Sequence, residues 1–191
     1  MIKSIVFKNK TYTITRSVLT AEIKDFIKNV FKTKYNANIN YFEESFLVLR
    51  NQENQILSVL GLRDYTNKNF LIESYLQKNI QEIIGKNIDP KKILEIGNLS
   101  SIEPEGFGSL LIFNSIDYIL NTNADYAFIT ATNRVRNILK KYKIIFEVIC
   151  PANKNNLENY EQWGNYYEQE TNLMKIDLIK TRENLQEKVY E

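Results

Sequence analysis

The chain has 191 residues, of which 43% are hydrophobic and 25% are charged, and its formal net charge is +2. Such a composition is typical of one globular domain, and the nearly balanced charge argues against an extended nucleic-acid surface. The chain has no histidine and one cysteine, Cys150, which excludes histidine-activated nucleophiles, imidazole zinc sites and an internal disulfide. We interpret the basic cluster Lys140, Lys141 and Lys143 as the solvated face of a helix.

The N-terminal segment MIKSIVFKNK lacks the apolar core and the cleavage site of a signal peptide. No segment approaches the roughly 18 uncharged apolar residues of a membrane-spanning helix. We therefore expect a cytoplasmic protein with no transmembrane segment, no nucleic-acid partner and no metal.

The first predicted elements are a hairpin and a helix. Residues 4–15, SIVFKNKTYTIT, contain two β-rich runs around Asn9-Lys10, which predicts a β-hairpin. Apolar residues then recur at helical spacing, with Thr20 as the expected N-cap and Glu22 in the first turn. The predicted apolar stripe consists of Ile23, Phe26, Ile27, Val30 and Phe31.

Further along, SFLVLRN and QILSVLGLRD flank a polar QEN, which predicts a second hairpin. FLIESYL is expected as a short strand or a strand-to-helix junction that leads into a helix near residues 76–84, which Asp89-Pro90 ends. The remaining expected elements are the strand KILEIGNL, the helix SLLIFNSIDYIL, the strand ADYAFITAT, the helix NRVRNILKKY with Asn133 as its N-cap, and the strands KIIFEVI and NLMKIDLI.

This order predicts an α/β protein of α+β layout, with one central mixed β-sheet and helices on both faces. A doubly wound fold is not expected, because a hairpin precedes the crossover units. We assign residues 1–179 to a single domain and residues 180–191 to a charged C-terminal tail.

The segment LEIGNLSSIEPEGFGS places Gly106 and Gly108 between a strand and a helix. The first backbone N–H groups of a helix lack intrahelical acceptors and can bind an anion. Gly106, Phe107, Gly108 and Ser109 are therefore the candidate cofactor-binding residues. By itself the Gly-x-Gly pattern indicates a plain turn, because the lysine of a Walker loop and the third glycine of a dinucleotide fingerprint are missing.

Residues 103–108, EPEGFG, resemble the loop Gln/Arg-x-x-Gly-x-Gly/Ala of GNAT-type N-acyltransferases. In that superfamily the loop follows a strand bearing a carboxylate, opens a helix and holds the pyrophosphate of an acyl carrier. The chain departs from the pattern at Glu103, whose charge opposes an anion. The resemblance thus implies binding by backbone and helix dipole, for which the single phosphate of phosphopantetheine is at least as suitable as coenzyme A.

FLIESYL, ILEIGNLSS, YAFITATNRVRN and WGNYY occur in the order and spacing of the thermostable hemolysin family, a bacterial group within the GNAT-like superfamily. The resemblance covers about residues 26–178, and the layout is also similar to acyl-homoserine-lactone and N-acyl amino acid synthases. It implies an acyltransferase that moves a fatty acyl group to a small amine or amino acid. The cosubstrate would be acyl-CoA or the phosphopantetheine of an acyl-carrier protein, with no tightly bound cofactor.

Glu95 and Asn98 are the candidate catalytic residues. Glu95 lies on the strand before the glycine turn, where it could deprotonate the attacking ammonium directly or through water. Its structural alternative is an ion pair with Arg63 inside the sheet. Asn98 could orient a substrate carbonyl or amine, or satisfy a strand end.

Arg63 and Glu73 are charges within apolar stretches, where an unpaired charge is costly. They are interpreted either as a mutual ion pair or as ligands of a substrate carboxylate. Trp163, Tyr166 and Tyr167 form an aromatic cluster that either packs in the core or lines an acyl-chain tunnel. All five are the candidate substrate-binding residues.

Many GNAT enzymes carry a tyrosine proton donor on the helix after the fifth strand. In ILKKYKI, Leu139 occupies the corresponding position and Tyr142 follows three residues later. A thiol is acidic enough to depart without that donor, so activity is still expected. Two alternative functions remain open: a directly membrane-active hemolysin, and a GNAT-like binding module without catalysis.

Overall fold

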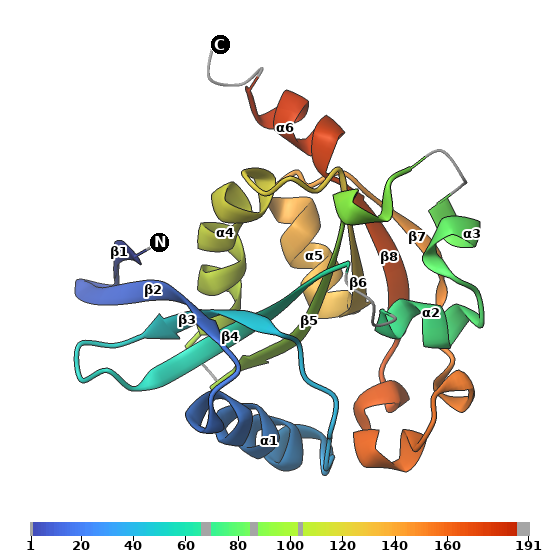
Figure 1. Cartoon of the computed structure of the whole chain (residues 1–191). Helices are drawn as coiled ribbons and strands as arrows, with labels where there is room; N and C mark the ends of the chain where they lie inside the picture. The colour runs from blue at the N-terminus through green and yellow to red at the C-terminus, as the bar shows by residue number, and fades with distance from the viewer. Residues whose placement is uncertain (1, 66–69, 85–87, 103–104, 187–191) are drawn as a thin grey trace. The chain divides into compact units, whose positions relative to one another are not determined.

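The computed structural model describes residues 2–65, 70–84, 88–102 and 105–186. Its eight strands follow the hydrogen-bonded order β1-β2-β3-β4-β5-β6-β8-β7 (Figure 1). β5 pairs in parallel with β6, whereas the β1–β2, β2–β3, β3–β4, β6–β8 and β7–β8 pairs are antiparallel. The predicted mixed sheet is therefore confirmed. The chain forms two compact units, which are described separately below.

The first unit comprises Met1–Arg63, Gly97–Ser115 and Glu161–Tyr166. Its elements are β1 (Ile2–Phe7), β2 (Lys10–Val18), α1 (Ala21–Tyr35), β3 (Ser45–Arg50), β4 (Ile56–Asp64), the second half of β5 (Ile93–Ser101), the beginning of α4 (Phe107–Leu120) and most of the 3-10 turn η3 (Tyr160–Trp163). Both predicted hairpins are present, and β1 and β2 turn at Lys8 and Asn9, which have positive φ.

Helix α1 forms where the apolar stripe predicted it. Ile23, Ile27 and Phe31 are buried, and the Thr20 side chain accepts a hydrogen bond from the Ile23 N–H, as expected for the N-cap. At the other end Asn36 adopts a left-handed conformation with φ of 50°, and its N–H bonds back to the Lys32 carbonyl. α1 lies along one side of β3 and β4 in Figure 1. Its cap and stripe are local signals, which explains why they could be read from the sequence.

The second unit comprises Asp64–Ile96, Ile116–Tyr160 and Tyr167–Glu191. Its elements are α2 (Leu71–Leu76), α3 (Ile80–Ile84), η1 (Pro90–Lys92), the first half of β5, the end of α4, β6 (Tyr126–Thr132), α5 (Asn133–Lys141), β7 (Phe146–Pro151), η2 (Lys154–Asn156), most of η4 (Tyr166–Glu168), β8 (Thr171–Asp177) and α6 (Leu178–Gln186). Within this unit the parallel register of β5 and β6 runs from Ile93–Tyr126 to Ile96–Ile129.

Three details differ from the sequence prediction. FLIESYL forms helix α2 and no strand, and Gln77 ends it in a left-handed conformation before α3 begins at Ile80. Thr132, not Asn133, is the N-cap of α5. The first part of the charged C-terminal segment is helical, since α6 extends to Gln186. Thr181 is fully buried there and donates a hydrogen bond to the Asp177 carbonyl.

Candidate active site

Glu95 lies on β5 in the second unit and is only 4% exposed. Its two carboxylate oxygen atoms accept hydrogen bonds from the backbone N–H groups of Leu71, at 2.8 Å, and Ile72, at 3.0 Å. These groups belong to the first turn of α2, whose N–H groups have no acceptor within the helix. The carboxylate is thereby fixed by two charge-assisted hydrogen bonds. The expected alternative, a pair with Arg63, joins residues of different units and stays a prediction.

Glu73 lies on α2 itself and accepts hydrogen bonds from the beginnings of both α2 and α3. Its Oε2 accepts from the Phe70 N–H at 2.7 Å, which caps the start of α2. Its Oε1 accepts from the Ile80 N–H, also at 2.7 Å, and so ties the beginning of α3 to α2. Backbone donors therefore satisfy both oxygen atoms of this buried carboxylate. Its predicted substrate-binding role stays a prediction.

Tyr75, which was not among the residues predicted for the site, lies on α2 with an exposed fraction of 3%. Its hydroxyl is hydrogen-bonded to the hydroxyl of Tyr167, and Asn156 donates to its backbone carbonyl at 2.6 Å. Burial raises the pKa of Tyr75 well above the usual range, as do Tyr167 and, more weakly, the charge of Glu95, while a hydrogen bond with Thr130 lowers it in part. Tyr75, Tyr167, Thr130 and Glu95 thus form a polar cluster inside the second unit.

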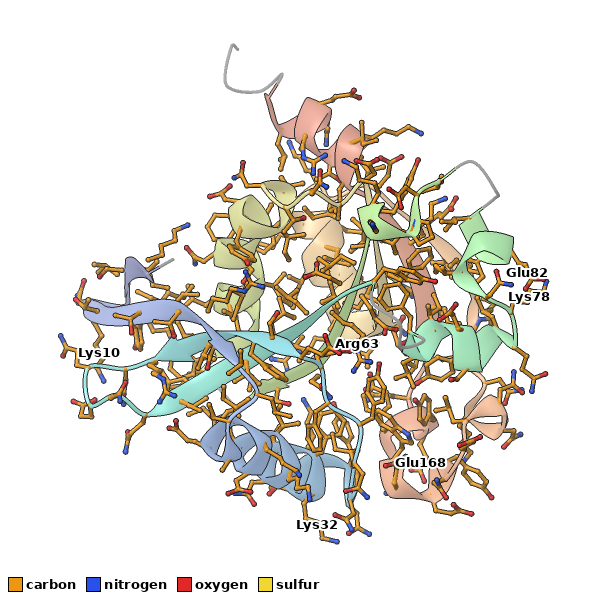
Figure 2. All side chains as sticks on the ribbon, in the orientation of Figure 1. Lys10, Lys32, Arg63, Lys78, Glu82 and Glu168 are labelled. Carbon is orange, nitrogen blue, oxygen red and sulfur yellow. The ribbon has the colours of Figure 1, made fainter. Side chains whose placement is uncertain are left out.

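Arg63 lies at the C-terminal end of β4 in the first unit (Figure 2) and is 6% exposed. Its Nε donates to the Glu43 carboxylate at 2.7 Å, and its Nη2 donates to the Phe42 carbonyl at 2.8 Å. The guanidinium carbon lies 4.7 Å from the ring centroid of Tyr41. Glu43, the ionic partner within this unit, was not predicted from the sequence. A pair between Arg63 and Glu73 would join the two units and stays a prediction.

Burial raises the pKa of the Glu43 carboxyl, although Arg63 opposes this effect. Two glycines make room for the Glu43 side chain. A Cβ atom added at Gly61 would lie 2.6 Å from the Glu43 Cγ, and one at Gly97 would contact the Glu43 carboxylate end. Glycine is therefore required at both positions as long as the carboxylate lies between them.

Asn98, the second candidate catalytic residue, lies within β5 and has a positive φ of 46°. Its Oδ1 accepts from the Glu43 N–H at 2.7 Å, and its Nδ2 donates to the Tyr41 carbonyl at 3.2 Å. A left-handed residue inside a strand redirects the adjacent peptide groups away from the regular ladder. Asn98 therefore connects an irregular point of β5 to the segment that carries Glu43.

The glycine turn leads directly into α4. Gly106 has a positive φ of 83°, and its carbonyl accepts from the Leu110 N–H in the first bond of the helix. The N–H groups of Phe107, Gly108 and Ser109 hence precede this ladder, and Gly108 and Ser109 are half-buried. The Phe107 ring is buried against Tyr12, with centroids 5.6 Å apart, and anchors the turn. Glu103 lies outside the described residues.

The predicted aromatic cluster is divided between the two units. In the first unit Trp163 and Tyr166 contact Phe31 of α1, with ring centroids 6.1 Å and 5.8 Å from the Phe31 ring. Tyr167 belongs to the second unit, where it contacts Tyr75. Aromatic packing accounts for Trp163 and Tyr166, and a role of any of the three in substrate binding stays a prediction.

At the position of the usual GNAT tyrosine, Leu139 is buried in α5, and Tyr142 forms the C-terminal cap of that helix. In the part of the chain that the structure describes, no helix is long and apolar enough to cross a lipid bilayer. Nor do three or more metal-binding side chains gather anywhere in residues 2–65, 70–84, 88–102 and 105–186.

The model of the family described as Thermostable hemolysin matches residues 15–182. No curated protein matches the chain. Among solved structures, the acyl-homoserine-lactone synthase LasI is 10% identical, with a TM-score of 0.61 over 88% of this chain and 91% of that one. FeeM, an N-acyl amino acid synthase from uncultured soil microbes, is 13% identical, with a TM-score of 0.60 over 89% and 93%.

Arylalkylamine N-acetyltransferase 2 from Aedes aegypti is 15% identical, with a TM-score of 0.54 over 86% of this chain and 99% of that one. Identities this low show the fold alone. The GNAT-like fold that the sequence predicted is thereby confirmed.

Proposed function

The chain belongs to the thermostable hemolysin family, and on that premise we propose that it is an acyltransferase. The donor is a fatty acyl thioester of coenzyme A or of an acyl-carrier protein, and the acceptor is a small amine or amino acid. The protein acts in the cytoplasm, where both donors are made. The observation that carries this proposal is the fixed, buried Glu95 on the strand that leads to the glycine turn of α4.

The start of α4 supports binding of the donor. Its N–H groups at Phe107, Gly108 and Ser109 precede the hydrogen-bond ladder and carry the positive end of the helix dipole. Gly106 supplies the positive φ of the turn, and nothing lies within 4 Å of the place where a side chain would begin. A phosphate of the donor can therefore approach the backbone closely.

The reaction itself needs a base. A carboxylate takes one proton from the ammonium, and the free amine attacks the thioester carbonyl, forming the C–N bond. The tetrahedral intermediate then breaks its C–S bond, the sulfur keeps the electron pair, and the nitrogen loses its remaining extra proton to water. Glu95 suits the first step because it is a buried carboxylate whose oxygen atoms are held in place by two backbone donors.

The test is a product assay. Purified protein is incubated with acyl-CoA or acyl-carrier protein and with candidate acceptors, and amides are detected by mass spectrometry. We expect Glu95→Gln to lower the rate by roughly 10²- to 10⁴-fold, the usual contribution of a general base. Glu53→Gln, which alters an exposed carboxylate in the β3–β4 turn, serves as the matched control and should retain full activity.

The same assay tests Arg63 as a ligand of the acceptor's carboxylate. An amino acid and the amine obtained by its decarboxylation are compared as acceptors, and a strong preference for the amino acid supports that role. Absence of amide with every donor and acceptor contradicts the acyltransferase. Release of dye from liposomes by the protein alone, without any substrate, would instead favour direct membrane lysis.

A further inference from the structure

A proton donor is missing from the position where GNAT enzymes usually carry one, because Leu139 is buried there. We propose that the hydrogen-bonded hydroxyl pair of Tyr75 and Tyr167 supplies the proton to the departing thiolate. The inference rests on the proposed acyl transfer. It assigns the acid step to Tyr75 of α2 and Tyr167 of η4, for which the family resemblance implied no acid role.

The two hydroxyls are in direct hydrogen-bond contact. In such a pair one hydroxyl donates to the other, so the second retains a proton for a third group. When the pair gives up that proton, the hydroxyl that remains can donate to the new phenolate and stabilise it. The Thr130 hydroxyl makes a further hydrogen bond that favours the phenolate of Tyr75.

The same helix, α2, holds the proposed base and carries Tyr75. Glu95 binds the N–H groups of Leu71 and Ile72, and Tyr75 follows one turn later on the same helix. Asn156 of η2 holds the Tyr75 carbonyl at 2.6 Å, and α2 also packs against β6, which carries Thr130. Tyr75 is buried whereas Tyr167 is half-buried, so the pair extends from the interior toward solvent.

The charge of Glu95 links the two proton transfers. As a carboxylate it raises the pKa of Tyr75, since a second negative charge nearby is unfavourable. Once Glu95 has taken the proton of the ammonium, it is neutral and this effect disappears. The tyrosine pair is therefore a weak acid before the amine is activated and a stronger acid afterwards. As a result, proton transfer from the ammonium to Glu95 comes before proton transfer from the tyrosine pair to sulfur.

Bonds, electrons and protons are conserved in the proposed reaction. The C–S bond breaks, its electron pair stays on sulfur, and the sulfur takes a proton from the tyrosine pair. The phenolate regains a proton from Glu95, directly or through water, and Glu95 thereby returns to its carboxylate form. The products are the amide and the free thiol of the carrier.

The coupling can be tested on the protein without substrate. The tyrosines are labelled with ¹³C at Cζ, their resonances are assigned with Tyr75→Phe and Tyr167→Phe, and the protein is titrated with base. We expect the Tyr75 resonance to titrate at lower pH in Glu95→Gln than in the wild type. An unchanged Tyr75 titration in a folded Glu95→Gln protein overturns the coupling, whether or not acyl transfer is found.

The acid step is tested by the leaving group. We expect Tyr75→Phe and Tyr167→Phe to lower kcat by roughly 10²-fold with an ordinary acyl thioester. With the 4-nitrothiophenyl ester of the same acyl group, whose thiolate needs no proton to depart, both variants should match the wild type. Tyr160→Phe, at a 40% exposed tyrosine, is the control and should be fully active with both donors.

A purely structural role would reduce the two rates equally, and that result overturns the acid role. Full activity of both variants with the ordinary thioester overturns it as well. If the wild type forms no amide at all, the proposed function and the acid role fail together, while the titration still decides whether Glu95 and Tyr75 are coupled.

Discussion

Arg63 and Glu43 form a buried ion pair, in which the Arg63 Nε donates to the Glu43 Oε2 at 2.7 Å. Removing one partner of such a pair leaves the other charge without compensation in the interior. We therefore expect Glu43→Ala to lower the free energy of unfolding by about 3–5 kcal/mol, measured by urea denaturation. Glu22→Ala breaks the more exposed pair with Arg50 and should cost about 1 kcal/mol or less. Equal losses in the two variants would contradict the role of burial.

Gly97 should be coupled to Glu43. The three atoms nearest to a Cβ at residue 97 are the Cγ, Cδ and Oε1 atoms of Glu43, so Gly97→Ala forces the carboxylate to move. We expect a loss of about 1–3 kcal/mol from overpacking. In the background of Glu43→Ala these atoms are gone, and the same substitution should cost much less. Strictly additive free energies of unfolding in this double-mutant cycle would show that the two residues are independent.

Asn98 combines a left-handed backbone with two side-chain hydrogen bonds. Asn98→Gly removes only the side chain and leaves the buried Glu43 N–H without its acceptor, at a cost of about 1–3 kcal/mol. Asn98→Ala adds the strain of a left-handed alanine, roughly 1–2 kcal/mol more. Asn54 in the β3–β4 turn also has a positive φ, of 64°, and serves as the comparison. There we expect Asn54→Ala to be less stable than Asn54→Gly by the strain of a left-handed alanine alone. Chemical denaturation of all four variants checks the prediction, which fails if Asn98→Gly is as stable as the wild type.

The raised pKa of Glu43 should make the free energy of unfolding depend on pH. Its pKa in the folded protein is raised above the ordinary value of 4.5, mainly by burial. Between the unfolded and the folded pKa the native state binds more protons, so this residue's contribution to stability falls as pH rises through that window and is constant above it. The difference in unfolding free energy between the wild type and Glu43→Gln, measured from about pH 4 to about pH 8, should decline in that way. A difference that grows with pH would show that attraction by Arg63 outweighs burial.

Local signals made much of the fold predictable. The N-cap Thr20 and the buried stripe Ile23, Ile27 and Phe31 are separated by three or four residues, so one helical turn relates them. β5, α4, β6 and α5 were likewise expected, because each is a single apolar or periodic run. FLIESYL was ambiguous because only part of its cap is local. Glu73 caps the Phe70 N–H from within the segment, whereas the N–H groups of Leu71 and Ile72 are satisfied by Glu95, more than twenty residues along the chain.

The residues of the candidate site also divide into those that the sequence identified and those that only the structure revealed. The sequence identified Arg63, Glu73 and Glu95 as charges inside apolar segments, which required partners. It did not identify Glu43, which stands beside another glutamate in the polar run before β3, or Tyr75, which resembles an ordinary core residue.

The order of the elements, the helix caps and the need for buried charges to be satisfied were thus determined by the sequence itself, since they depend on neighbouring residues and composition. Only the tertiary structure decided that Glu43 pairs with Arg63, that Glu95 accepts hydrogen bonds from the first turn of α2 and that the hydroxyls of Tyr75 and Tyr167 are hydrogen-bonded. Hydrogen bonds form over about 3 Å, and folding alone brings groups from such distant parts of the chain within that range.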